Sequence, residues 1–130
     1  MKLEITNRIT LDQDTELIEE VHVVDVKEKA NATYLIYEND DKEKVVIKLK
    51  EEELTMSRFS KPQSLMIFKN QQQVLIALPT PAGIQQFVTD TKTYHLDLKK
   101  QEVVLAYALL QANSELAFAN YDLKLKWYND

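Results

Sequence analysis

Residues 121–128 read Tyr-Asp-Leu-Lys-Leu-Lys-Trp-Tyr, in which apolar and charged side chains alternate over most of the stretch. Because neighbouring side chains of a β-strand point to opposite faces of the sheet, this spacing predicts a strand with one buried and one solvated face. The same alternation returns in two earlier stretches, whose apolar members are Leu3, Ile5 and Ile9, and Val45, Ile47 and Leu49. The chain is therefore expected to be rich in half-buried strands.

Other stretches are apolar on both faces and are bounded by polar turns. Residues 65–68 and 74–78 are separated by Lys69-Asn70-Gln71, and Pro79 ends the second run because proline cannot donate to a hydrogen-bond ladder. Further strand-like segments cover residues 15–27, 33–38, 54–58, 84–91 and 92–99. Roughly nine or ten short strands predict a barrel or a sandwich. A closed barrel would remove the exposed edges that make apolar strands hazardous.

Residues 101–112 allow two interpretations. The segment is rich in Ala, Leu and Glu, so its local propensity favours a helix. Its larger apolar residues nevertheless share the parity of one strand face, at Val103, Leu105, Tyr107 and Leu109. The residues alone leave helix and strand open here.

Length and composition limit the classes of protein to which the chain can belong. The 130 residues fit one domain, residues 1–130, of which 45% are apolar. There is no cysteine, which excludes disulfides, thiolate metal sites and a cysteine nucleophile. The net charge of −5 argues against nucleic acid as a partner, because such binding depends on neutralising phosphates.

The hydropathy pattern predicts neither a membrane protein nor a secreted one. No apolar run approaches the roughly 20 residues that span a bilayer. Residues 1–5 alternate polar and apolar side chains and lack the apolar core of a signal peptide. We therefore expect a cytoplasmic protein with no membrane partner.

An ordered set of short motifs runs through about three quarters of the chain. It comprises Tyr34-Leu35-Ile36-Tyr37-Glu38, Ile47-Lys48, Leu54-Thr55-Met56-Ser57-Arg58, Phe68, Leu78, Thr80, Gly83, Thr89, Thr91, Tyr107, Leu109 and residues 121–125. In this order and spacing the motifs resemble the DUF1934 family, the YwiB-like proteins of Gram-positive bacteria. The chain departs from similar proteins at Ser60, where they tend to have glycine, and at Leu78, where they often have tyrosine.

The resemblance implies an all-β fold, a lipocalin-like or calycin-like antiparallel β-barrel of roughly eight to ten strands. It favours strand over helix for residues 101–112. It implies no activity, because the family has no established one to carry over, and we expect no cofactor.

Arg58 is the most informative single residue, because it shares the parity of Leu54 and Met56 on a strand whose apolar side chains are expected to face inward. An isolated buried charge is expensive, so an inward arginine needs a partner or water. One hypothesis makes Arg58 the receptor for a ligand carboxylate or phosphate. The alternatives are a structural ion pair with an acidic side chain, or a strand-end position that reaches solvent.

The threonines after the second apolar run give a weaker hypothesis. They are Thr80, Thr89 and Thr91, and they surround Gly83, the only glycine. These residues could form the polar mouth of a cavity, or simply a turn followed by an ordinary strand. Gly83 is expected where the backbone needs a positive φ or a close approach.

Catalytic and metal-binding patterns are not found in the sequence. His22 and His95 are the only histidines, and neither has a second ligand at a metal spacing. Ser57, Ser60, Ser64 and Ser114 lack the elbow motif of a serine nucleophile. We expect neither a metal site nor an enzyme.

We therefore expect a non-enzymatic module that binds a small, partly apolar or amphiphilic molecule, whose head could be anionic. The alternative is a filled barrel that acts through its surface as a protein-interaction or homodimerisation domain with no ligand. The candidate ligand-contacting residues are Arg58, Tyr34, Met56, Thr80, Thr89 and Tyr107.

Overall fold

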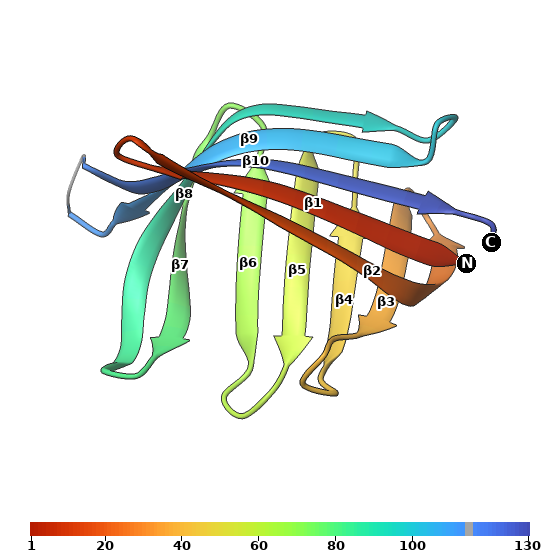
Figure 1. The fold of residues 1–130 in the computed structure, drawn as a ribbon, viewed down its shortest axis with the longest axis horizontal. Helices are drawn as coiled ribbons and strands as arrows, with labels where there is room; N and C mark the ends of the chain where they lie inside the picture. The colour runs from red at the N-terminus through yellow and green to blue at the C-terminus, as the bar shows by residue number, and fades with distance from the viewer. Residues whose placement is uncertain (114–115) are drawn as a thin grey trace.

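The computed structural model describes residues 1–113 and 116–130, so Ser114, one of the serines considered above, lies outside the described residues. Ten β-strands are found there (Figure 1), and no described segment is a helix long and apolar enough to cross a membrane. In chain order the strands are β1 (Lys2–Leu11), β2 (Asp14–Lys29), β3 (Ala32–Glu38), β4 (Lys44–Leu49), β5 (Glu53–Phe59), β6 (Ser64–Lys69), β7 (Gln73–Thr80), β8 (Gly83–Asp97), β9 (Glu102–Gln111) and β10 (Ala117–Tyr128).

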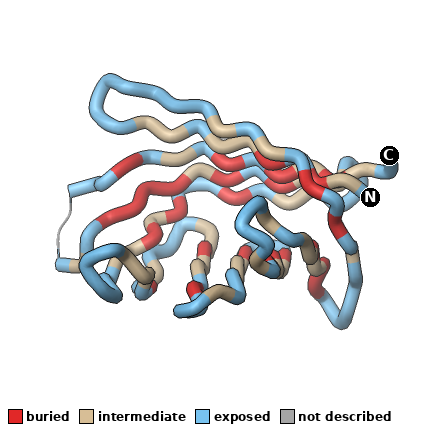
Figure 2. Tube along the Cα trace, turned by 60° about the horizontal axis from the view of Figure 1, so that its bottom comes forward, coloured by how far each residue is buried: buried red, intermediate tan, exposed pale blue. Residues whose placement is uncertain are grey.

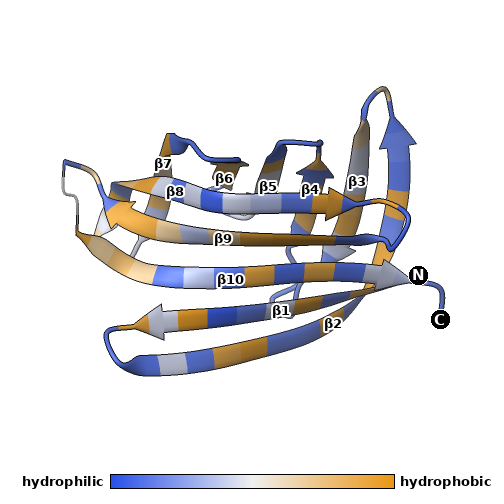
Figure 3. Cartoon of the chain, turned by 90° about the horizontal axis from the view of Figure 1, so that it is seen from above, coloured by the Kyte–Doolittle hydropathy of each residue, from blue (hydrophilic) through white to orange (hydrophobic). Residues whose placement is uncertain are grey.

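The strands form two layers that share β2. The first part of β2 pairs antiparallel with β1 as far as Val23, and the rest pairs with β3 from Val24 onward. One layer contains the later part of β8, β9, β10, β1 and the start of β2. The other contains the end of β2 with β3, β4, β5 and β6, and β7 with the first part of β8 stands beside β6 (Figure 1). In Figure 3 the long strands β8, β9, β10 and β1 run across β3, β4 and β5. The result is a calycin-like antiparallel barrel, as predicted from the sequence.

The core lies between the layers and takes alternate residues from the strands (Figure 2). β9 covers the segment whose composition favours helix, and it contributes Val103, Leu105 and Tyr107 to the core. A strand points all three side chains to one face, while its backbone pairs with β8 and β10 on either side. Burial of the apolar face therefore outweighs the local helix propensity. In β10 the core residues are Leu123, Leu125 and Trp127.

β8 is one continuous strand, whereas the sequence suggested two segments, residues 84–91 and 92–99. Its pairing with β9 shifts between Thr91 and Thr93, which marks a β-bulge. Thr89 and Thr91 are buried before the bulge, and Tyr94 is buried after it. The bulge thus shifts the inward-facing positions from odd-numbered to even-numbered residues without ending the strand.

The barrel is not fully closed. Within the described residues β6 pairs only with β5, and β7 only with β8, so these two strands end the sheet order. Pro79 on β7 has no N–H to donate to a ladder with β6. The side chain of Thr89 joins the two ends of the sheet here, because its Oγ1 donates a hydrogen bond of 2.6 Å to the backbone oxygen of Ile67.

A second free edge belongs to β2. Residues 14–23 pair with β1 on one side, and no described residue forms a ladder with their other side (Figure 3). The inward positions on this part of β2 are Ile18, Glu20 and His22.

The hairpin turns use positive φ angles almost without glycine. Gly83 has a φ of 107°, as predicted for the only glycine. Positive φ angles also occur at Asp12, Ala30, Lys42, Gln71, Gln101 and Asn113. Aspartate and asparagine tolerate this conformation, whereas alanine carries a steric cost that glycine would not.

Candidate ligand-binding site

A cavity of about 420 Å³ lies at the end of the barrel that carries the β3–β4, β5–β6 and β7–β8 connections (Figure 1). Residues from the ends of β3 to β7 line it, and β2 contributes one residue, Glu20, from the other layer. Its size lies within the range of small-molecule sites in proteins.

Apolar side chains form much of the cavity wall. Met56 on β5 and Met66 on β6 are directly opposite each other in the antiparallel pair, and Val45 on β4 is buried beside them. Leu78 and Pro79 from the end of β7 complete this part of the wall. Methionine side chains are flexible and polarisable, so this surface can adapt to apolar groups of different shapes.

The charged residues of the cavity are three carboxylates and one guanidinium. The carboxylates belong to Glu20, Asp40 and Asp41, and the guanidinium belongs to Arg58. Arg58 is exposed at the penultimate position of β5, with Val45 on one neighbouring strand and Ser64 on the other. No described residue forms a hydrogen bond or an ion pair with its side chain. Arg58 is therefore a strand-end residue that reaches the cavity, and it has no structural ion pair within the described residues.

Glu20, His22 and Tyr37 form a contact chain that joins the two layers. The His22 ring is 8% exposed and stacks on the Tyr37 ring at a centroid distance of 4.6 Å. Its Nε2 lies 3.1 Å from Oε1 of Glu20, within hydrogen-bonding distance. The pKa of Tyr37 is raised to about 12, first by burial and then by the Glu20 carboxylate, while the Arg58 guanidinium opposes the rise. The Tyr37 hydroxyl therefore experiences both charges.

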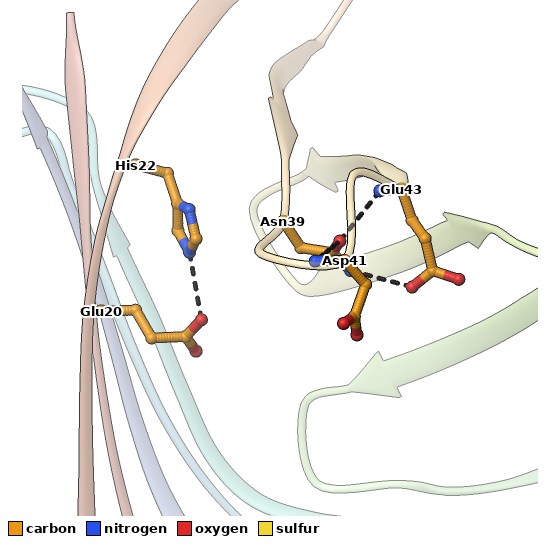
Figure 4. A network of polar contacts seen from close by, with 5 residues as sticks. All are labelled: Glu20, His22, Asn39, Asp41 and Glu43. Atoms are coloured by element: carbon orange, nitrogen blue, oxygen red, sulfur yellow. Dashed lines mark hydrogen bonds and ion pairs between the residues drawn. The ribbon is translucent and has the colours of Figure 1, made fainter.

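The β3–β4 turn, which carries Asp40 and Asp41, is fixed by the side chain of Asn39. The Asn39 Oδ1 accepts hydrogen bonds from the backbone N–H groups of Asp41 at 3.0 Å and Glu43 at 2.9 Å. The Asn39 Nδ2 donates to Oε1 of Glu43 at 3.1 Å. Figure 4 shows this network on the turn, opposite the Glu20–His22 contact on β2. Carboxylates therefore stand on two sides of the cavity, and local hydrogen bonds hold each side in place.

The side chains around the cavity are of mixed chemistry. Across residues 1–113 and 116–130, no group of three or more histidine and acidic side chains is arranged to hold a metal ion. The cavity instead combines an adaptable apolar wall, one unpaired guanidinium and several carboxylates. Such a mixture can orient a small molecule through a few polar contacts while it buries an apolar part.

Comparison with known proteins shows which family this chain belongs to. The family model described as "Domain of unknown function (DUF1934)" matches residues 3–125. The chain belongs to the DUF1934 family. The resemblance seen in the sequence motifs is thereby confirmed.

A solved structure has the same fold as this DUF1934 chain. The crystal structure of ywiB protein from Bacillus subtilis is similar to it with a TM-score of 0.78 and 21% sequence identity, over 98% of this chain and 91% of that one. At this identity the likeness concerns the fold alone. No curated protein matches the chain.

The DUF1934 barrel brings two of the six sequence-predicted site residues, Arg58 and Met56, to the cavity. Tyr34 lies on the outer side of β3, where the Nζ of Lys48 is 5.8 Å from its ring centroid. Thr80 is the last residue of β7, next to the β7–β8 turn, and its Oγ1 donates to the Gly83 backbone oxygen at 2.6 Å.

The other two predicted residues are buried in the barrel. Thr89 forms the link to β6 described above. Tyr107 stacks on Tyr121 at a centroid distance of 4.7 Å and contacts Phe68 at 4.5 Å. Neither residue lines the cavity, so Thr89 and Tyr107 pack the interior of the barrel.

Most residues at the cavity were not proposed as ligand contacts from the sequence, and three of the residues missed there form one contact chain. They are Glu20, His22 and Tyr37. The alternation of residues 18–24 contains the missing signal, because Glu20 and His22 share the parity of Ile18 and Val24, and Val24 is buried. Tyr37 similarly shares the parity of the buried Leu35. Two polar residues at apolar positions of one strand indicate either a polar interior or a site.

Proposed function

We propose that this protein is a non-enzymatic binding module for a small, partly apolar molecule. The observation that carries the proposal is the cavity at the end of the barrel, where an unpaired guanidinium stands beside an adaptable apolar wall. Apolar burial supplies affinity at such a site, and a small number of polar groups fixes the orientation of the ligand. We further propose that the protein acts in the cytoplasm, in keeping with a chain that contains no cysteine.

Arg58 is the proposed polar anchor. A guanidinium presents several N–H donors in one plane and can hold a carboxylate or phosphate through two parallel hydrogen bonds. The Arg58 side chain has no hydrogen-bond or ion-pair partner among the described residues, so a ligand would compete only with water for its N–H donors.

Native mass spectrometry of freshly purified protein tests whether the cavity binds a molecule. A co-purified mass that is lost on denaturation is the expected result. The Arg58→Gln variant should retain the fold by circular dichroism and lose most of that mass. Arg8→Gln, which changes the chain's other arginine on the outer face of β1, is the matched control and should retain it. Equal retention in both variants would remove Arg58 from the proposal.

A second candidate function, homodimerisation, is favoured by the free edge of β2. Ten consecutive residues, 14–23, have an unpaired side within the described chain, and the outer-face residues Leu17, Val21 and Val23 are each more than half exposed. Two copies could pair antiparallel along this edge about a two-fold axis, which would extend each sheet and cover the three apolar residues. Analytical ultracentrifugation should then show a dimer that Val21→Lys dissociates. A monomer at all accessible concentrations would contradict this candidate.

A further inference from the structure

We propose that the ligand of the cavity is zwitterionic, with a cationic group that contacts Glu20, an anionic group that contacts Arg58, and an apolar part against Met56 and Met66. The inference rests on the proposed binding function and specifies the chemical class of the ligand. It is carried by the arrangement of opposite charges around one cavity.

Glu20 and Arg58 approach the same side chain from different layers of the barrel. Glu20 is on the inward face of β2, Arg58 is near the end of β5, and the charges of both act on the Tyr37 hydroxyl. Glu20 and Arg58 nevertheless do not form an ion pair with each other, although both line the cavity. The site thus presents two opposite charges that are close to one phenol and remain apart. A molecule with two charged groups of its own can satisfy both.

The balance of charge disfavours the simpler ligand classes. Three carboxylates oppose a single guanidinium in the lining, so a ligand with only an anionic group would meet net repulsion. A ligand with only a cationic group would cover Arg58 without pairing it, and burial of an unpaired charge is costly. A wholly apolar ligand would remove both charges from water without compensation. A zwitterion pairs Arg58 and at least one carboxylate at the same time.

The acidic side of the site is held in place before any ligand arrives. The Glu20 carboxylate is in contact with the buried ring of His22, and the ring is itself fixed against Tyr37. Across the cavity Asn39 anchors the turn that carries Asp40 and Asp41 (Figure 4). Charged groups that are already ordered lose less conformational entropy on binding, so they favour a ligand whose cationic group reaches them.

Two families of zwitterions fit this description, and calorimetry with matched analogues separates them. The first series is the dipeptide Leu-Leu, its C-terminal amide, its N-acetyl form and the N-acetyl amide, which share one apolar body and differ only in charge. The second is an alkylphosphocholine, an alkyl phosphate and an alkyltrimethylammonium of the same chain length, each used below its micelle concentration. The zwitterion of at least one series should bind about tenfold or more tightly than its singly charged analogues, the ratio that one additional charged contact gives.

Charge-removing variants assign the two contacts. Glu20→Gln should abolish the advantage of the zwitterion over the anionic analogue, and Arg58→Gln should abolish its advantage over the cationic analogue. Glu19→Gln, which changes the exposed neighbour of Glu20 on the outer face, and Arg8→Gln are the controls and should preserve both advantages. Circular dichroism confirms that each variant is folded.

The outcomes separate this inference from the function on which it rests. If a neutral or singly charged analogue binds as tightly as the zwitterion, the ligand class is wrong and the binding function stands. If Asp40→Asn removes the preference and Glu20→Gln does not, the assignment of the cationic group to Glu20 is wrong. If no compound of either series binds, the ligand class is wrong, and if the purified protein also carries no additional mass, the binding function itself fails.

Discussion

The Oγ1 of Thr89 donates a hydrogen bond of 2.6 Å to the backbone oxygen of Ile67, and this bond connects β8 to β6 where β6 and β7 form no ladder. Thr91, two residues further along β8, is equally inaccessible to solvent, but its Oγ1 has no hydrogen-bond partner among the described residues. Two buried threonines of one strand therefore have opposite energetic roles. Thr89 donates to a carbonyl of β6, whereas Thr91 buries a hydroxyl that has no hydrogen-bond partner among the described residues.

Valine substitutions should separate these roles. Thr89→Val leaves the Ile67 oxygen without its donor and should lower the free energy of unfolding by about 1–2 kcal/mol. Thr91→Val replaces an unsatisfied hydroxyl with a methyl group of similar size, so it should change stability by less than about 0.5 kcal/mol or increase it. Urea denaturation of the two variants measures the difference. Equal losses would mean that the Thr91 hydroxyl has a partner such as a buried water.

Tyr94 provides a second test of how the layers are joined. Its hydroxyl donates to the backbone oxygens of Lys50, at 2.7 Å, and Glu53, at 3.1 Å, and so ties β8 to the β4–β5 connection. Tyr94→Phe should cost about 1 kcal/mol of stability because these carbonyls lose a donor. Tyr34→Phe is the control, since its ring stays near Lys48. It should alter the urea midpoint little, and a similar shift in both variants would contradict the role of the Tyr94 hydroxyl.

Two turn residues should respond in opposite directions to exchange between glycine and alanine. Gly83 has a φ of 107° and nothing within 4 Å of the position that a Cβ would occupy, so Gly83→Ala should cost about 1–2 kcal/mol through backbone strain alone. Ala30 has a φ of 52° in a two-residue turn between Lys29 and Ala32. Ala30→Gly should stabilise the protein by about 0.5 kcal/mol, because relief of strain exceeds the added entropy of the unfolded chain. Thermal unfolding of both variants checks the two signs.

The fold was largely predictable from periodicity, and its exceptions have local causes. Alternation predicted β1, β4 and β10 because their buried residues, such as Leu3 and Leu125, keep one phase along the strand. The alternation divided β8 into two segments because the bulge near Lys92 changes the phase of its buried positions. A bulge arises from pairing with β9, and a local sequence pattern does not record that pairing. For β9, composition favoured helix and the parity of the apolar residues fitted a strand, and the family resemblance decided between them in favour of strand.

The site was less predictable than the fold. Arg58 and Met56 were found because they follow Leu54 along one strand face. Tyr34 and Thr80 were proposed as contacts from their chemistry, without knowledge of which face or which end of the barrel they occupy. Glu20 reaches the cavity only because β2 passes from one layer to the other. Such long-range placement is a property of topology, so a sequence pattern read over a few residues does not reveal it.

The raised pKa of Tyr37 predicts how stability depends on alkaline pH. A tyrosine whose pKa is about 12 in the folded protein and 10 in the unfolded chain contributes its full stabilisation below pH 10 and loses it as the pH rises through 12. The free energy of unfolding should therefore fall across this interval, by at most about 1.4 kcal/mol per pH unit for one group. Urea denaturation at several pH values should show a shallower fall for Tyr37→Phe than for the unchanged protein, although other tyrosines with raised pKa values contribute with the same sign.

The charges that surround Tyr37 allow a sharper form of this test, which also reports on the cavity. The Glu20 carboxylate raises the pKa of Tyr37 and the Arg58 guanidinium lowers it, so Glu20→Gln should lower that pKa and Arg58→Gln should raise it. Difference titrations of tyrosinate absorbance, each variant with and without Tyr37→Phe, isolate this one group. Shifts of opposite sign are expected because the two charges that act on the hydroxyl have opposite signs. If neither variant moves the Tyr37 titration, the charges are further from the phenol than the structure has them, and the zwitterion site loses its geometric basis.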